Sequence, residues 1–225
     1  ISPERGFLPD RLDEAQRAAV AEGLADGAAI VRRKTEAAGH KVNGWSINYR
    51  GASFGNDFLL RAAVAMDQIY IMDAREALYA SARVDAGGKA LSGRNRYRLR
   101  FAPGKLPPID AFWSVTMYHD KGFLVDNPID RWSIGDRTPG LRHDADGSLD
   151  IVIQHDPPPP HDRANWLPAP EGGFMLLMRL YNPRAEMRDG KWKPPLVVIL
   201  EANEEASAGL HLQHAGETER NPTNE

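Results

Sequence analysis

The sequence predicts a mainly β protein with an N-terminal helical segment, in which the strands form an antiparallel, jelly-roll-like β-sandwich. Two observations support this fold class. Up to about Tyr79 the apolar residues recur at three- and four-residue steps, as in helices, and from Ala80 onward they alternate, as in strands. After this change of period, about eight short apolar runs are separated by Gly, Pro, Asn and Asp turns, which is the spacing of a sandwich.

Two helices are expected in the N-terminal segment. The first covers residues 12–36, with Asp10 as its N-cap and with Gly23 and Gly27 as weak points in its middle. Its apolar stripe predicts a helix that packs on the rest of the fold. The second covers residues 57–74, and its predicted buried face contains Leu59, Ala63, Met66 and either Ile69 or Tyr70.

Glycine and proline predict the loops between elements, and the distribution of apolar residues predicts the strands. Residues 39–56 are rich in glycine and predict a loop with a short extended piece at 45–49, and residues 156–173 predict a stiff surface loop around a run of four prolines. Both the run 111–119 and the last strand are expected to be central, because apolar residues occur at both parities. The predicted strands are two around the turn 85–89, then 97–101, 111–119, 121–126, 131–136, 148–155, 173–182 and 194–202.

Three parts are expected along the chain. A helical N-terminal segment, residues 1–79, packs on a β-sandwich domain, residues 80–202, and a C-terminal tail, residues 203–225, has few apolar residues and no periodicity. A homo-oligomer is expected, with the tail as a candidate contact between copies. The chain begins with Ile rather than Met, so a processed product is one expectation and the C-terminal part of a longer protein is another.

Composition narrows the function classes. The net charge of −3 argues against a nucleic-acid partner, since phosphate binding needs clustered Lys and Arg. No apolar run approaches the roughly 20 residues of a membrane span. The absence of cysteine excludes disulfides and thiol nucleophiles, and no HExxH, P-loop, GxSxG or GxGxxG pattern is present, so neither a metal nor a cofactor is predicted.

The densest polar cluster, in the turn after the run 111–126, is the best candidate for a site. Carboxylates and guanidiniums close together there can clamp an anionic or hydroxylated ligand, or can equally pair with each other to fix the turn. His155, at the end of an alternating strand, is either a general base or a structural residue. Arg179 and Tyr181 share one strand face, which is either concave, forming a pocket with Trp113, or covered by the helices. The candidates are Asp136 and His155 for catalysis and Trp113, Asn127, Arg131, Arg137, Arg179 and Tyr181 for ligand binding.

A resemblance adds to this interpretation. The stretch FWSVTMYHDKGFLVDNPIDRWSIGDRTPGL, together with SLDIVIQH, NWLPAPEGGFMLLMRLYNP and WKPPLVV, resembles a bacterial family known as domain of unknown function 1214. The resemblance covers residues 78–200 and implies a jelly-roll-like β-sandwich and a periplasmic or secreted location, but almost nothing about activity. Longer members carry a preceding domain of unknown function 1254, of which only the linking segment is present here.

Two function classes remain open at this point. The first is a protein that binds or acts on a glycan or a small hydroxylated or anionic molecule in a polar cleft. The second is a non-catalytic module that binds a ligand or assembles with copies of itself. Whether the protein is an enzyme is left open by the sequence.

Overall fold

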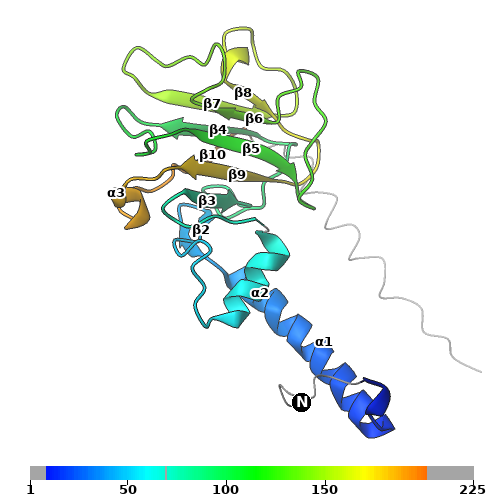
Figure 1. Cartoon of the computed structure of the whole chain (residues 1–225). Coiled ribbons are helices and arrows are strands. Elements are labelled where there is room, and N and C mark those ends of the chain that lie inside the picture. The colour runs from blue at the N-terminus through cyan, green and yellow to red at the C-terminus, as the bar shows by residue number, and fades with distance from the viewer. Residues whose placement is uncertain (1–8, 69, 202–225) are drawn as a thin grey trace, which may run out of the picture.

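Two β-sheets that pack face to face form the body of the protein (Figure 1). The computed structural model describes residues 9–68 and 70–201. Within these residues, a six-stranded sheet in the order β1-β2-β3-β9-β5-β6 lies against a four-stranded sheet in the order β10-β4-β7-β8. The predicted class, mainly β with an N-terminal helix and a sandwich-like arrangement, is confirmed, and the jelly-roll connectivity stays a prediction.

The elements have the following bounds. The six-stranded sheet contains β1 (His40–Val42), β2 (Trp45–Ile47), β3 (Ala77–Ala82), β5 (Trp113–His119), β6 (Ser133–Gly135) and β9 (Phe174–Tyr181). The four-stranded sheet contains β4 (Arg96–Phe101), β7 (Leu149–Gln154), β8 (Trp166–Pro168) and β10 (Val197–Glu201). The helical elements are η1 (Pro9–Arg11), α1 (Glu14–Ala37), α2 (Phe58–Asp67), η2 (Arg163–Asn165) and α3 (Ala185–Arg188).

The core lies between the sheets and follows from alternation. In β9 every second side chain, starting with Phe174, is buried, and the side chains between them are half-buried on the other face. Tyr97 of β4 meets Phe174 edge-on, with ring centroids 5.8 Å apart. Phe101 and Trp113 also join the sheets, with ring centroids 5.0 Å apart and planes tilted by 46°. Each strand of the six-stranded sheet therefore has an inner, core face and an outer face.

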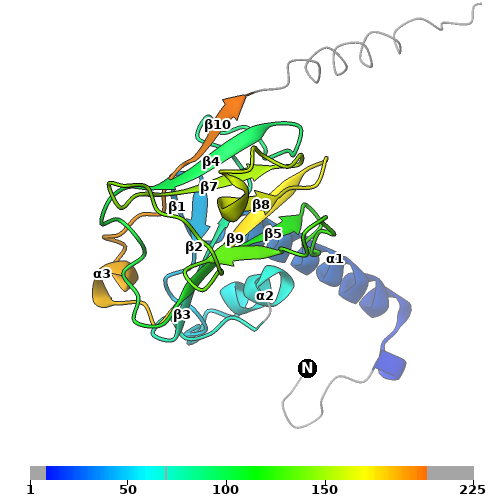
Figure 2. The same cartoon turned by 90° about the horizontal axis from the view of Figure 1, so that it is seen from above.

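Strand pairing differs from the prediction at three places. All pairs are antiparallel except β7 and β8, which run parallel. β8 lies in the predicted surface loop and is held by buried Trp166, whose Nε1 donates to the Gln154 carbonyl at 2.9 Å. The predicted strand 121–126 is wrong, because it makes only a single bridge, Tyr118 to Leu124, and exposes Phe123. The last strand, β10, forms an edge of its sheet rather than its centre (Figure 2).

The first helix also departs from expectation. The N-cap of α1 is Asp13, which forms a capping box with Gln16, whereas the predicted cap, Asp10, lies in the preceding turn η1. The helix is unbroken at Gly23 and Gly27 and extends away from the sandwich (Figure 1). It contacts α2 but buries none of its own residues. The packing of the N-terminal segment on the sandwich stays a prediction.

The second helix is shorter than predicted and is rotated. It ends at Asp67, and it buries Leu60, Ala63 and Val64 instead of the predicted set. Leu59 and Met66 are exposed, and Ile69 lies outside the described residues. The chain leaves the helix after Asp67, and the segment that follows is held by the Met72 carbonyl, which accepts a hydrogen bond from the Ala52 N–H at 3.1 Å. No helix within residues 9–68 and 70–201 combines the length and apolar character that crossing a membrane requires.

Strands β1 and β2 lie in the segment 39–56, which was expected to be a loop with a short extended piece at 45–49; β2 falls in that extended piece, whereas β1 was not predicted. β2 pairs with β3, so this segment contributes an edge of the six-stranded sheet. Trp45 is fully buried, and its Nε1 donates to the Pro195 carbonyl at 2.7 Å. The predicted tail, residues 203–225, lies outside the described residues.

Candidate functional site

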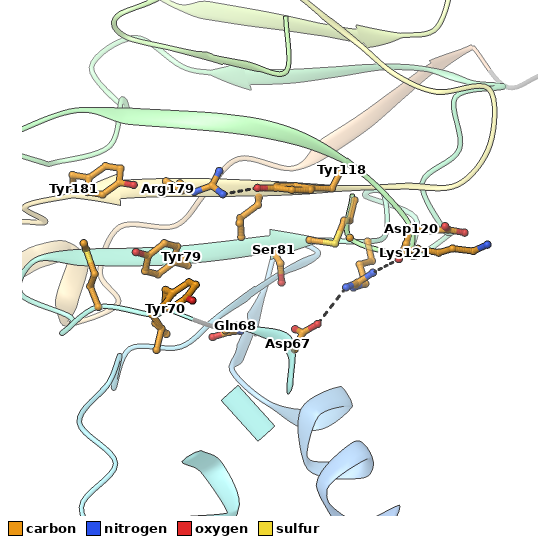
Figure 3. Close-up of a pocket in the computed structure, with 16 residues that line it drawn as sticks. Asp67, Gln68, Tyr70, Tyr79, Ser81, Tyr118, Asp120, Lys121, Arg179 and Tyr181 are labelled. Atoms are coloured by element: carbon orange, nitrogen blue, oxygen red, sulfur yellow. Dashed lines mark hydrogen bonds and ion pairs between the residues drawn. The ribbon is translucent and has the colours of Figure 1, made fainter. Parts of the chain in front are cut away.

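A pocket of about 650 Å³ opens on the outer face of the six-stranded sheet (Figure 3). Its floor comes from β3, β5 and β9, and its wall comes from the end of α2 and the segment that follows it. The volume is in the range of small-molecule sites. The lining residues used below are Asp67, Gln68, Met72, Tyr79, Ser81, Arg83, Tyr118, Asp120, Lys121, Met175, Leu177, Arg179 and Tyr181.

Strand register explains why these floor residues meet. Tyr79 of β3 and Ser114 of β5 both lie directly opposite Arg179 of β9, and directly opposed residues of neighbouring strands share a face. The core takes the even-numbered side chains of β9, so its odd-numbered side chains, from Met175 to Tyr181, form the floor.

Arg179 is the central polar group of the floor. Its guanidinium donates to the Thr116 hydroxyl (Nη1 to Oγ1, 2.6 Å) and to the Tyr118 hydroxyl (Nη2 to Oη, 2.6 Å). The side chain is half-buried and forms no ion pair with any carboxylate of the described residues. A guanidinium has five N–H donors, so three of them have no hydrogen-bond partner among the described residues.

Aromatic side chains occupy one end of the pocket. Tyr181 and Tyr79 lie on the same side of Arg179 in Figure 3. Phe112 stacks on Tyr181 with centroids 4.3 Å apart and planes at 26°, and the guanidinium of Arg137 lies 3.9 Å from the Phe112 centroid. Burial raises the pKa of the Tyr79 phenol, and the nearby Tyr181 phenol raises it further, whereas Arg179 lowers it. Tyr79 therefore remains a neutral hydrogen-bond donor at pH 7.

Charged side chains occupy the other end. Arg83 pairs with Asp67 (Nη2 to Oδ1, 3.7 Å) and donates to the backbone carbonyl of Asp120 (3.4 Å). It thereby connects the end of α2 to the turn after β5. The side chain of Asp120 is 2.5 Å from Nδ1 of His119. Both carboxylates at this end thus already have cationic or N–H neighbours.

The wall segment is fixed by Asp73. Its Oδ1 accepts hydrogen bonds from the backbone N–H and Nε of Arg75 at 2.9 and 3.0 Å, and its Oδ2 accepts from the Ser53 hydroxyl at 3.1 Å. These bonds, above all the backbone N–H of Arg75, lower the pKa of Asp73 to about 2. The ionised carboxylate is the form that holds the turn.

Replacing Asp73 by Asn is expected to lower stability at pH 7 and to matter less in acid. The pKa of Asp73 in the folded protein lies below the usual aspartate value of 3.8, so its contribution to stability is fully present above that value and is lost as pH falls toward about 2. Urea unfolding at pH 7 and at steps between pH 4 and 2 measures this. Asp156→Asn, which removes an exposed carboxylate, is the control. A stability difference that stays constant over this window would contradict the role of Asp73.

Three of the predicted site residues, Asp136, Asn127 and Arg131, bond to the backbone. Oδ1 of Asp136 accepts from the Trp113 N–H at 3.1 Å, and Oδ1 of Asn127 accepts from the backbone N–H of Ile129 and Arg131. Nη1 of Arg131 donates to the carbonyls of residues 163, 164 and 166 at 2.9 to 3.0 Å. Arg131 also lines a smaller, mainly apolar groove with Pro128, Ile129, Pro157, Arg163 and Trp166.

The remaining predicted residues fall in three places. His155 is exposed, with Nδ1 at 3.0 Å from the Ala169 carbonyl and Nε2 at 3.7 Å from Glu171. Trp113 is buried in the sandwich core, on the opposite face from the pocket. Arg179 and Tyr181 line the pocket, and Arg137 reaches it indirectly through Phe112. The structure thus does not bring Asp136, His155 and Arg131 together around either of the two cavities described above.

Other pocket residues had weaker sequence signals. Tyr118, which lines the pocket, and Thr116, which accepts a hydrogen bond from Arg179, have the parity opposite to the core residues of β5, which is the pattern of an outer face. No sequence pattern near Asp67 and Gln68 marks them as site residues. They line the pocket only because α2 ends at this point of the chain. Gln68 has a buried Oε1 with no hydrogen-bond partner among the described residues. Within residues 9–68 and 70–201, no cluster of His, Asp and Glu has the form of a metal site.

Comparison with known proteins places the sheet in a family. The model of the protein family of unknown function DUF1214 matches residues 76–185, from the start of β3 to the start of α3. This part of the chain belongs to the DUF1214 family. The DUF1214 region contains the floor of the pocket, including Arg179, whereas the wall residues 67–68 and 70–72 lie before it.

One of two similar solved structures supports the fold. The VPA0106 protein from Vibrio parahaemolyticus is 24% identical with a TM-score of 0.61, over 87% of this chain and 46% of that one. An uncharacterised protein from Burkholderia cenocepacia is 16% identical with a TM-score of 0.41, over 98% of this chain and 48% of that one. The chain thus spans about half the length of these proteins. No curated protein matches it in sequence.

Proposed function

We propose that this DUF1214 protein binds a small organic anion in the outer-face pocket, with Arg179 as the anchor. The observation that supports this most is the half-buried guanidinium, which bonds to two hydroxyls but to no described carboxylate. A cation that is partly removed from water and lacks a counterion is unfavourable. An anion entering the pocket would supply the missing charge.

The geometry of Arg179 favours a carboxylate. The Thr116 and Tyr118 hydroxyls hold both terminal nitrogens, so the guanidinium is oriented before a ligand arrives. A planar guanidinium with free N–H groups can donate two parallel hydrogen bonds to one carboxylate. Pre-orientation lowers the entropy lost on binding.

Catalysis by Asp136 and His155 receives no comparable support. Asp136 bonds to the Trp113 backbone, and His155 is exposed beside Ala169 and Glu171. Neither residue lines the pocket that contains Arg179. The proposal is therefore of a binding site.

A thermal-shift screen of the full chain tests this function. Carboxylic acids are compared at pH 7 with their primary amides, which have the same shape without the charge. At a ligand concentration of about 100 Kd, binding adds roughly 2.7 kcal/mol, which corresponds to a shift of about 5–10 °C for a domain of this size. We expect the acids to raise the melting temperature and the amides to leave it unchanged. Equal effects of acid and amide across the panel would overturn the proposal.

Assembly with a second copy is a second candidate, supported by the helical arm. α1 buries none of its residues, and α2 exposes Phe58, Leu59 and Met66. Exposed apolar side chains grouped on one element are typical of interaction surfaces. Light scattering decides this point, since a mass equal to the 24.9 kDa of one chain at micromolar concentration would count against it.

A further inference from the structure

We propose that the anion is an aromatic monocarboxylate, with its carboxylate on Arg179 and its ring at the end of the pocket formed by Tyr79 and Tyr181. This inference rests on the proposed function and specifies the ligand of the same site. Three observations support it: the net charge of the lining residues, the stacked aromatic side chains at one end, and the pairing of the two pocket carboxylates with neighbouring side chains.

The charge of the pocket fits one negative charge. Its described lining residues include three cations, Arg83, Lys121 and Arg179, against two carboxylates, Asp67 and Asp120, for a net charge of +1. A monoanion neutralises this charge. A phosphate monoester carries about −1.5 to −2 at pH 7 and would leave an excess.

The aromatic end is built as a stack. Arg137 lies over Phe112, and Phe112 stacks on Tyr181, so the Tyr181 ring is supported from outside the pocket. A rigid aromatic wall loses little conformational entropy on contact with a flat ligand. Met72 also lines the pocket, and thioether sulfurs make favourable contacts with ring edges, whereas Leu177 and Met175 lie on the other side of Arg179 along β9.

The polar groups favour this ligand over a sugar. A sugar needs several acceptors for its hydroxyls, but Asp67 is paired with Arg83, and the Asp120 side chain lies against His119. The other polar groups near Arg179 are the hydroxyls of Ser81 and the tyrosines, and Gln68 supplies a single unpartnered carbonyl acceptor, Oε1, where a sugar would need several. Tyr79, whose pKa is raised by burial, keeps its proton and can donate to the second carboxylate oxygen or to a ring substituent.

Calorimetric titration of the full chain with five probes tests the inference. The probes are 2-naphthoate, its neutral amide, 2-naphthyl phosphate, decanoate and glucuronate. Aromatic contacts of this kind correspond to about two- to tenfold in affinity each, so 2-naphthoate is expected to bind roughly tenfold more tightly than decanoate or glucuronate. The amide and the phosphate are expected to bind more weakly than 2-naphthoate.

The results distinguish a failure of the aromatic preference from a failure of the anion site itself. If decanoate or glucuronate binds as tightly as 2-naphthoate, the aromatic preference is overturned while the anion site stands. If 2-naphthyl phosphate binds most tightly, the monoanion is overturned. If none of the charged probes binds, the proposed function itself fails.

Two variants distinguish loss of the ring contact from a general loss of folding as the cause of weaker binding. Tyr181→Leu is expected to weaken 2-naphthoate by about five- to tenfold and to leave decanoate nearly unchanged. Tyr49→Leu removes a half-buried tyrosine outside the pocket and is expected to alter neither affinity. A loss of both ligands in Tyr181→Leu, with an unchanged melting temperature, would contradict a ring-specific role for Tyr181.

Discussion

Arg179→Met is expected to abolish binding of the organic anion. Removing one partner of a close charge pair typically costs about 2–5 kcal/mol, which is roughly 30-fold or more in affinity. The loss has a specific cause here, because Arg179 is a half-buried pocket cation that no described carboxylate neutralises, and its guanidinium is already oriented by Thr116 and Tyr118. Titration of wild type and variant with the same carboxylate measures the effect.

Two further variants make this result interpretable. Arg179→Lys keeps the charge but lacks the planar fork, so an intermediate loss is expected. Arg98→Met removes a strand arginine on the other sheet, 3.6 Å from Asp150, and is expected to leave affinity within about twofold, since exposed pairs contribute little. Equal affinity in Arg179→Met and Arg98→Met would contradict the anchor role of Arg179.

Arg131→Met is expected to destabilise the fold without changing ligand affinity. Nη1 of Arg131 donates to three carbonyls around η2 and the start of β8, and each would lose its charged donor. Hydrogen bonds to charged groups contribute about 1.5–3 kcal/mol each, and one nitrogen shared by three acceptors supports a total loss of about 2–4 kcal/mol. The melting temperature should fall by on the order of 5–10 °C.

The control lies in the same region. Arg142 is exposed, its side chain makes no hydrogen bond or ion pair with the described residues, and Arg142→Met should change stability by less than about 0.5 kcal/mol. Thermal unfolding and carboxylate titration are measured on both variants. If Arg131→Met kept its melting temperature and lost ligand, the turn after Asn127 would be the binding site and the pocket at Arg179 would not.

Alternation in the sequence predicted two of the residues that line the pocket. The run 173–182 places Arg179 and Tyr181 on one face because strand side chains alternate, and both do line the pocket. The same rule excludes Trp113 from that face, since it lies directly opposite Leu180, whose side chain is in the core. Which side chains of a strand share a face depends only on their spacing along the chain, so it could be predicted from the sequence. Which face is concave is not a local property.

The wall of the pocket depended on contacts that no local pattern encodes. The apolar pattern of residues 57–74 fits one long helix, yet α2 ends at Asp67, and the chain returns across the sheet, where Ala52 donates to the Met72 carbonyl at 3.1 Å. Conversely, the polar turn from Asn127 to Arg137 drew attention by composition. In the structure, Asn127 and Arg131 form hydrogen bonds with backbone groups. In a sequence, polar residues that fix a turn in this way look the same as polar residues that bind a ligand.

A crystal structure of the full chain with bound 2-naphthoate tests the central claim most directly. The predicted result is a carboxylate about 3 Å from the guanidinium nitrogens of Arg179, with the naphthalene ring beside Tyr79 and Tyr181. A naphthoate seated instead in the groove between Arg131 and Trp166, with the pocket at Arg179 unoccupied, would contradict the account.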